Sequence, residues 1–287
     1  MDNEQHTEVP AEEEKSFLRV IVHSFFIIPF LIAVFGVLLF AGMRLLTQEK
    51  RSVYDYLNDV KVGGRSKRWQ GAFELSKMLA NPKLVPQEER FDNELISAFK
   101  AAQHDDNRVR QYLALAMGRT QRKVFGPVLT ASLAEEKEEN LPALIYAIGM
   151  IGDPGNAERL HEFVGHGNAR VRSITVVALG RLGDPQSVEF LKKGLQDPEP
   201  NVKWGSAISL ANMGDLSGKS VLLNVLDRDY LSQFSEVDPT EQNDLIMAAI
   251  NAGAVYDDRD IKSRIKFISE KDNNMMVRAA ALKAVKK

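Results

Sequence analysis

Apolar residues recur at helical spacing through most of the chain. Leu160 and Val164 lie four residues apart, and Val171 and Leu179 lie eight apart in a second stretch, so each stretch predicts a helix with one apolar face. A Gly-Asp-Pro segment at 152–154 breaks the pattern between such pairs, because Pro is tolerated in the first turn of the next helix. The pattern therefore predicts helix hairpins, and since a hairpin of about 30 residues cannot bury its apolar faces alone, consecutive hairpins must stack into a solenoid.

The hairpins repeat with a fixed period. The segments IGDPGNA, LGDPQSV and MGDLSGK begin at Ile151, Leu182 and Met213, which gives an interval of 31 residues both times. Positions 129, 160, 191 and 222 are all Leu, and a column of small residues contains Gly118, Gly149, Gly180 and Ala211. Such a column predicts that neighbouring helices approach each other closely.

The same register extends over the rest of the body. KRWQGAFELSKML from Lys67 aligns without gaps on VKWGSAISLANMG from Val202, which makes Trp69 and Trp204 equivalent and predicts packing roles for both. Two insertions interrupt the period, one at the stretch NPKLVPQEER and one at RDYLSQFSEVDPT, residues 228–240. We expect an all-α solenoid domain at 44–287, with about seven hairpins from about residue 52.

One segment lacks the amphipathic pattern. Residues 20–43 carry no charge, and His23 and Ser24 are their only polar side chains. As a helix this run spans about 36 Å, enough for a hydrocarbon core of about 30 Å with some tilt, and Pro29 predicts a kink rather than an end. A cleaved signal peptide would have a shorter apolar run and a basic start, and a buried core helix is the other alternative. We expect an uncleaved transmembrane helix at 20–43.

Charge is distributed unevenly around this segment. The whole chain has a net charge of -2, whereas the tail at 1–19 alone carries -4 and is predicted to be disordered. The first twenty residues after the span hold Arg44, Lys50, Arg51 and Lys61, against two basic residues before it. The positive-inside rule then favours a cytoplasmic solenoid, as in a single-pass protein of the bacterial inner membrane.

Composition excludes several classes of protein. The chain of 287 residues is 44% hydrophobic and 26% charged, which excludes wholesale disorder, a collagen-like sequence and a multi-span membrane protein. It has no cysteine, so disulfides, thiolate zinc sites and a cysteine nucleophile are excluded. A nucleic-acid groove should be basic throughout, and the near-neutral charge argues against one.

Two motifs approach known functional patterns without matching them. GDLSGKS at 214–220 is one residue short of a phosphate-binding loop and follows a helix rather than a strand, so it predicts a turn between hairpins. HEFVGH at 161–166 misses the zinc-protease pattern by one residue, and its two His residues lie about 140° apart around a helix. We predict no catalytic, metal-binding or cofactor-binding residues.

The second helices begin with a recurring Asn, Val and basic residue, in NRVR at 107, NARVR at 168, NVKW at 201 and NMMVR at 274. Together with the helix ending ALGRLGD, this resembles the HEAT-like repeats named after phycobilisome lyases. The resemblance implies an Asp-to-Arg ladder between repeats, in which an Asp lies five residues before the Val. Asp197 and Asp272 match this position, whereas His104 and His166 depart from it, which predicts gaps in the ladder.

Two columns of the repeat supply candidate partner-binding residues. The candidates are Arg110, Arg172 and Lys203 of one column, which also contains Arg278, and Arg181 of a second column, which also contains Arg119. A basic stripe of this kind would line the concave face, where helical repeats hold partners. The alternative, implied by the resemblance, is that the first three tie neighbouring repeats together.

Three further regions are candidates for contact. The insertion at 228–240 displays Tyr230, Leu231 and Phe234, and inserts in solenoids often carry recognition; the alternative is an incidental surface loop. Near the span, four cations that precede an aromatic ring would rest on anionic headgroups, and these residues are Lys61, Arg65, Lys67, Arg68 and Trp69. The terminal helix lacks a polar outer face, which predicts docking or self-association through the C-terminal hairpin.

The leading functional hypothesis is a membrane-anchored scaffold that binds other, membrane-associated proteins and catalyses no reaction. An accessory subunit of a larger transport, respiratory or secretion complex is the second hypothesis, and co-migration with that complex in native gels would distinguish it. A bilin-lyase-like enzyme follows from the resemblance alone and would bind a linear tetrapyrrole.

Overall fold

The chain forms two units in the computed structural model, Met1–Arg51 and Ser52–Lys287. The structure describes residues 22–47 and 51–286. The acidic tail predicted at 1–19 lies outside these residues, as do the first two positions of the segment 20–43.

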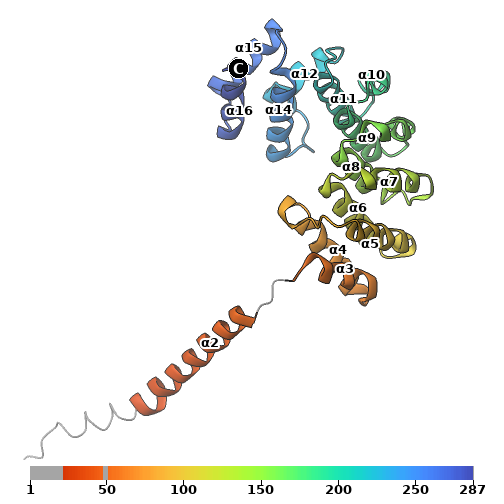
Figure 1. Cartoon of the computed structure of the whole chain (residues 1–287). Coiled ribbons are helices and arrows are strands. Elements are labelled where there is room, and N and C mark those ends of the chain that lie inside the picture. The colour runs from red at the N-terminus through yellow and green to blue at the C-terminus, as the bar shows by residue number, and fades with distance from the viewer. Residues whose placement is uncertain (1–21, 48–50, 287) are drawn as a thin grey trace, which may run out of the picture. The chain divides into compact units, whose positions relative to one another are not determined.

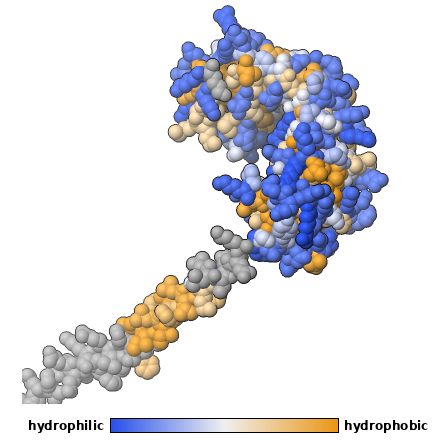
Figure 2. Space-filling model, in the orientation of Figure 1, coloured by the Kyte–Doolittle hydropathy of each residue, from blue (hydrophilic) through white to orange (hydrophobic). Residues whose placement is uncertain are grey.

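The first unit contains one long apolar helix. A π-helical turn, His23–Ile27, leads into α2, Ile28–Thr47. The change to α geometry falls just before Pro29, whose ring cannot donate the regular helical hydrogen bond. The stretch Phe25–Arg44 has a mean hydropathy of 2.7 and none of it is buried, and Figure 2 shows it as hydrophobic along its length. Within the described residues it is the one helix long and apolar enough to cross a membrane, a test of length and hydropathy that an N-terminal signal sequence also passes.

The second unit is a stack of helix hairpins. It begins at Ser52, whose side chain accepts a hydrogen bond from the Asp55 N–H while the Asp55 carboxylate accepts one from the Ser52 N–H. The solenoid therefore starts later than residue 44, because α2 continues to Thr47.

Residues 51–286 contain seven hairpins, as the repeat pattern predicts. They pair α3 (Val53–Val62) with α4 (Arg65–Met78), α5 (Glu89–Ala101) with α6 (Asn107–Thr120), α7 (Gly126–Ser132) with α8 (Leu141–Ile151), the 3-10 helix η7 (Glu158–Gly165) with α9 (Ala169–Leu182), α10 (Val188–Gly194) with α11 (Pro200–Asn212), α12 (Lys219–Val225) with α14 (Pro239–Gly253), and α15 (Arg259–Lys271) with α16 (Met275–Val285).

Each hairpin places its two helices in separate layers (Figure 1). The second helices, from α4 to α16, contact one another in order and line the concave side, whereas the first helices form the convex side. Short 3-10 turns and the short helix α13 (Arg228–Leu231) complete the connections. The inner layer is therefore a continuous surface that crosses every hairpin.

The recurring Gly-Asp-Pro segment ends one hairpin and begins the next. Gly152 and Gly183 are the C-caps of α8 and α9, with φ of 69° and 68°, a left-handed conformation that glycine adopts without steric cost. Asp153 and Asp184 then accept hydrogen bonds from the backbone N–H two residues later. The side chain of Asn168 caps the start of α9 in the same way. These local bonds explain why the motifs recur with the period of the hairpins.

Helices of the inner layer approach so closely that only small side chains fit. A Cβ added to Gly118, Gly149 or Gly180 would overlap the next helix. The added Cβ would lie 2.7 Å from Ala147 Cα at Gly118 and 2.9 Å from Ala178 Cα at Gly149, and it would overlap Ser209 at Gly180. Contacts this short force the backbone to move. The predicted small-residue column therefore sets the spacing of α6, α8, α9 and α11, and the prediction of close approach is confirmed.

We expect Gly149→Val to lower the free energy of unfolding by about 1–3 kcal/mol, because the added side chain overpacks the α8–α9 contact. Thermal unfolding of the full chain in mild detergent, followed by circular dichroism, measures the loss. Gly167→Ala is the control, since nothing lies within 4 Å of a Cβ at that position. Equal melting temperatures for both variants would contradict the assignment.

Candidate partner-binding groove

Half-buried side chains form a stripe along the concave face. They occupy equivalent positions on successive second helices and are Phe73 on α4, Leu115 on α6, Tyr146 on α8, Val177 on α9 and Ile208 on α11. The stripe is apolar except for the hydroxyl group of Tyr146. A concave surface of this kind is one on which a partner chain can lie.

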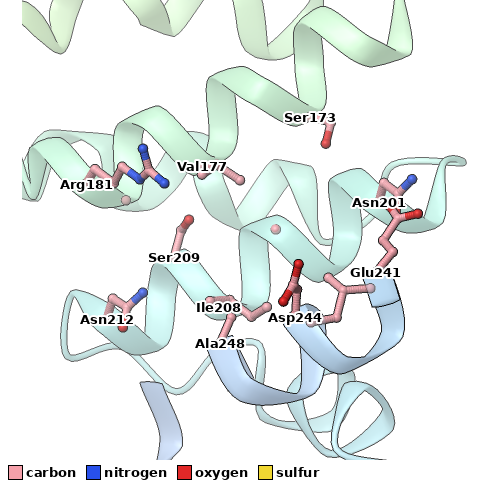
Figure 3. A pocket seen from close by; sticks show the side chains of 13 residues that line it. Ser173, Val177, Arg181, Asn201, Ile208, Ser209, Asn212, Glu241, Asp244 and Ala248 are labelled. Carbon is pink, nitrogen blue, oxygen red and sulfur yellow. The ribbon is translucent and has the colours of Figure 1, made fainter. Parts of the chain in front are cut away.

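The stripe deepens into a groove where α9, α11 and α14 meet. Its volume is about 420 Å³, within the range of about 300–1,000 Å³ that is typical of ligand sites. Val177, Ile208 and Leu245 supply its apolar surface. Figure 3 shows polar side chains around it, with Arg181 and Asn212 at one end, Asn201 and Glu241 at the other, and Asp244 between them.

The groove lies where the packing of the inner layer changes. At α11 the buried core divides into two groups. Leu210 packs with the buried residues of the earlier hairpins, whereas Trp204 packs with those of the later hairpins. Trp204 is fully buried, and its ring centroid lies 6.3 Å from that of Tyr230 and 4.9 Å from that of Phe234. The insertion at 228–240 thus packs two aromatic rings against Trp204 of α11, whereas the preceding second helices pack through glycine contacts.

The apolar side chains of the insertion pack largely inward, and their contact with a partner stays a prediction. Leu231 is fully buried, and Tyr230 and Phe234 are half-buried. The Trp204 Nε1–H donates to the Tyr230 hydroxyl at 3.4 Å. These side chains point inward because they complete the core of the sixth hairpin, where α12 and α13 are short. Their effect on a partner would be indirect, through the shape of the groove.

The groove carries opposite charges at its two ends. The Arg181 guanidinium lies 5.0 Å from the centroid of the Tyr146 ring and forms no ion pair with a described residue. Glu241 and Asp244 lie three residues apart on α14 and are exposed, and among the described residues neither carboxylate has a cationic partner. These three charges are therefore available to a ligand.

Two of the other predicted basic residues, Arg110 and Arg172, tie neighbouring hairpins together. Arg172 on α9 donates to both carboxylate oxygens of Asp197 in the next hairpin, at 2.7 and 2.9 Å, and to loop carbonyls of its own hairpin. Arg110 makes the equivalent pair with Glu136 at 2.8 Å. With 4% of its surface exposed, Arg110 is not available to a partner. The structure thus favours the tying role for Arg110 and Arg172 over the concave basic stripe.

The two expected gaps in this ladder have different outcomes. At His104 the acidic residue is displaced by one position, and Asp105 pairs with Arg68 of the preceding hairpin. At the second gap the preceding hairpin presents Leu141, which is buried and apolar. Lys203 is half-buried and forms no ion pair within the part of the chain that the structure describes.

Every cation of the predicted membrane-proximal cluster has an acidic partner. The pairs are Lys61 with Glu94 (3.3 Å), Arg65 with Asp106 (3.7 Å), Lys67 with Asp59 (3.0 Å), and Arg68 with Asp105. Trp69 is half-buried, and the Arg108 guanidinium lies 4.6 Å from its ring centroid. This pairing reduces the positive charge that anionic headgroups would attract.

The motifs GDLSGKS and HEFVGH contain side chains that pack against neighbouring elements of the solenoid. Lys219 of GDLSGKS contacts Asp258 and Asp260, each at 2.7 Å, and so ties α12 to the start of α15. The His161 ring stacks on Phe190 with centroids 4.0 Å apart, and burial lowers the pKa of His161. No group of three or more His, Asp or Glu side chains among residues 22–47 and 51–286 is placed to hold a metal ion.

The C-terminal hairpin leaves large apolar side chains exposed, namely Phe267 (56%), Met275 (76%), Met276 (69%) and Leu282 (46%). In a longer stack the end of a solenoid is covered by the next repeat or by a polar cap. Self-association or docking through this hairpin stays a prediction.

Comparisons with known proteins agree with this architecture. Residues 157–233 match the sequence profile of HEAT repeats. The solved complex of CpcE and CpcF of phycocyanin lyase from Nostoc sp. PCC7120 is similar, with a TM-score of 0.61 at 16% identity over 83% of this chain and 88% of that chain. The fold is a HEAT/armadillo-like α-solenoid.

Two further solved structures have lower TM-scores. An engineered protein is 17% identical over 82% of this solenoid chain and 95% of its own, with a TM-score of 0.37. A designed armadillo repeat protein is 15% identical over 82% and 99%, with a TM-score of 0.36. No curated protein matches the sequence. At 16% identity the likeness to the phycocyanin lyase complex shows the fold and not an activity.

The groove residues that the sequence pattern does not reveal lie on α14 of the HEAT-like solenoid. Glu241, Asp244 and Leu245 follow the insertion at 228–240, where the 31-residue register is lost, so no repeat column contains them. Among the charged groove residues only Arg181 is a predicted contact. One sequence signal could have indicated Glu241 and Asp244. They are two carboxylates three residues apart, so they lie on the same face at the start of the first long helix after the insertion.

The ladder pair Arg172–Asp197 contributes a pH-dependent stability to the solenoid. Burial by itself raises the pKa of Asp197, but hydrogen bonds from Arg172 and from the Glu199 N–H outweigh it and hold the pKa below its usual value. A carboxylate whose folded pKa is depressed stabilises the fold fully above the unfolded pKa of about 3.9, and this contribution is lost as pH falls through the folded value.

We expect Asp197→Asn to lower the free energy of unfolding by about 1.5–3 kcal/mol at pH 7, because the charged hydrogen bonds to Arg172 are lost. Below about pH 4 the difference from the unsubstituted chain should shrink. Urea titrations of the full chain in detergent, at pH 7 and below about pH 4, measure the free energy of unfolding of both chains. Glu162→Gln, at an exposed position on η7, is the control, and a loss at Asp197 that is the same at both pH values would contradict the electrostatic origin.

Proposed function

We propose that this protein is a single-pass membrane scaffold that holds a protein partner on the concave face of its solenoid, at the cytoplasmic surface of a bacterial inner membrane. The groove between α9, α11 and α14 supports this proposal most directly, because it combines an apolar surface with charges that no described residue neutralises. The proposal includes no catalytic step and no cofactor.

The apolar helix supplies the membrane part of the proposal. None of Phe25–Arg44 is buried, and the helix has no polar face to present to water, so a hydrocarbon environment suits it better than solution. A tether of this kind raises the effective concentration of the solenoid for partners in the same membrane, and modest intrinsic affinity then suffices.

We expect deletion of residues 1–47 to move the protein from the membrane to the soluble fraction, because the solenoid begins only at Ser52. The full chain should stay in the membrane after alkaline carbonate extraction. Intact mass of the purified protein is the control for processing. A mature chain that lacks the apolar helix would identify a signal sequence and contradict the anchor.

We expect Ile208→Glu to reduce partner capture at least about tenfold, because a charge at the centre of the groove disrupts its apolar surface. In-cell crosslinking followed by quantitative mass spectrometry compares the variant with Val124→Glu, which places the same charge at an exposed apolar position in the 3-10 turn before α7. An identical set and amount of crosslinked proteins from both variants would contradict binding in the groove.

A further inference from the structure

We propose that the groove recognises an extended peptide segment in which an aliphatic side chain lies next to a lysine or arginine, with a carboxylate several residues further along. This inference rests on the proposed function and specifies its ligand. The aliphatic side chain would contact Ile208 and Leu245, the cation would pair with Glu241 and Asp244, and the carboxylate would pair with Arg181.

The dimensions of the groove suit an extended segment. Its two ends are marked on α11 by Asn201 and Asn212, and eleven residues of α-helix span about 16 Å. An extended chain covers that distance with about five residues at 3.3 Å each. The side-chain amides of Asn201 and Asn212 are exposed. Each can donate hydrogen bonds to the carbonyl groups of a peptide backbone and accept them from its N–H groups.

The apolar part of the groove favours a branched aliphatic side chain. Val177, Ile208, Leu245 and Ala248 come from three different helices and are all half-buried, so a partner side chain can contact all three helices at once. Their remaining exposed surface is removed from water when such a side chain enters, which favours binding.

The charges decide the orientation and the class of ligand. Figure 3 shows Arg181 at one end of the groove, Glu241 at the other and Asp244 between them, so a segment with a cation toward the Glu241 end and a carboxylate at the Arg181 end fits in one direction only. The two carboxylates outnumber the single guanidinium, which selects a basic residue and repels the phosphates of a nucleic acid or an anionic headgroup.

The larger cavity of about 550 Å³ beside Val255, Lys266 and Val285 supports no comparable assignment. It lies at the open end of the stack, and nothing in the structure shows what covers it.

The test uses the full chain in lipid nanodiscs and a phage-displayed library of random dodecapeptides as the probe. We expect enriched peptides to carry Leu, Ile or Val within three residues of Lys or Arg. In fluorescence anisotropy titrations, the variant Glu241→Lys with Asp244→Lys should bind these peptides at least about tenfold more weakly and should prefer versions with glutamate in place of the basic residue.

The matched control is Glu158→Lys with Glu162→Lys, which reverses two exposed carboxylates on the convex helix η7 and should leave the affinity unchanged. Ile208→Ala should weaken binding without altering the charge preference. Circular dichroism confirms that each variant is folded.

Three outcomes would overturn the peptide assignment, namely no enrichment above empty nanodiscs, enrichment without a basic residue, or equal binding by the groove and control variants. If one of these occurs while Ile208→Glu still abolishes partner capture, the proposed function stands and only the ligand chemistry is wrong. If Ile208→Glu also has no effect on capture, both proposals fail.

Discussion

The close approach of the second helices is the constraint on which the rest of this solenoid depends. Gly118, Gly149 and Gly180 leave no room for a Cβ against the following helix, so the second to fifth hairpins are held at short distances from one another. On α11 the equivalent position is Ala211, and the buried aromatic ring of Trp204, also on α11, packs on the insertion. The only groove that we assign to a ligand lies at this change in packing, because α14 is no longer held by the same small-residue contact.

Ion pairs between hairpins separate structural charges from available ones. Arg68, Arg110, Arg172 and Arg228 each pair with an acidic residue of the following hairpin, and the Arg110 pair is almost completely buried. Breaking such a pair leaves a charge without its partner, so these residues are held in place. Arg181, Glu241 and Asp244 lie outside this ladder, and their charges can therefore orient a ligand on a rigid surface.

The apolar helix and the solenoid have different physical requirements. The solenoid covers its apolar residues within the stack, and its visible surface is largely hydrophilic, with small separate hydrophobic patches (Figure 2). The helix Phe25–Arg44 buries none of its apolar surface within the protein. Such a helix is long and apolar enough to cross a membrane, which is why the proposed function joins a tether to a binding surface.

The sequence by itself determined the helices, their period and the small-residue column, because each depends on residues close in the chain or on a spacing that repeats. It also indicated the apolar helix and the location of the insertion. The tertiary structure decided that Leu231 packs inward, that Arg110 pairs with Glu136, and that Glu241 and Asp244 border the same groove as Arg181. Periodicity shows which face of a helix is apolar, but an insertion removes the register that tells which helix that face will meet. Contacts across such a break depend on distances that only the folded chain sets.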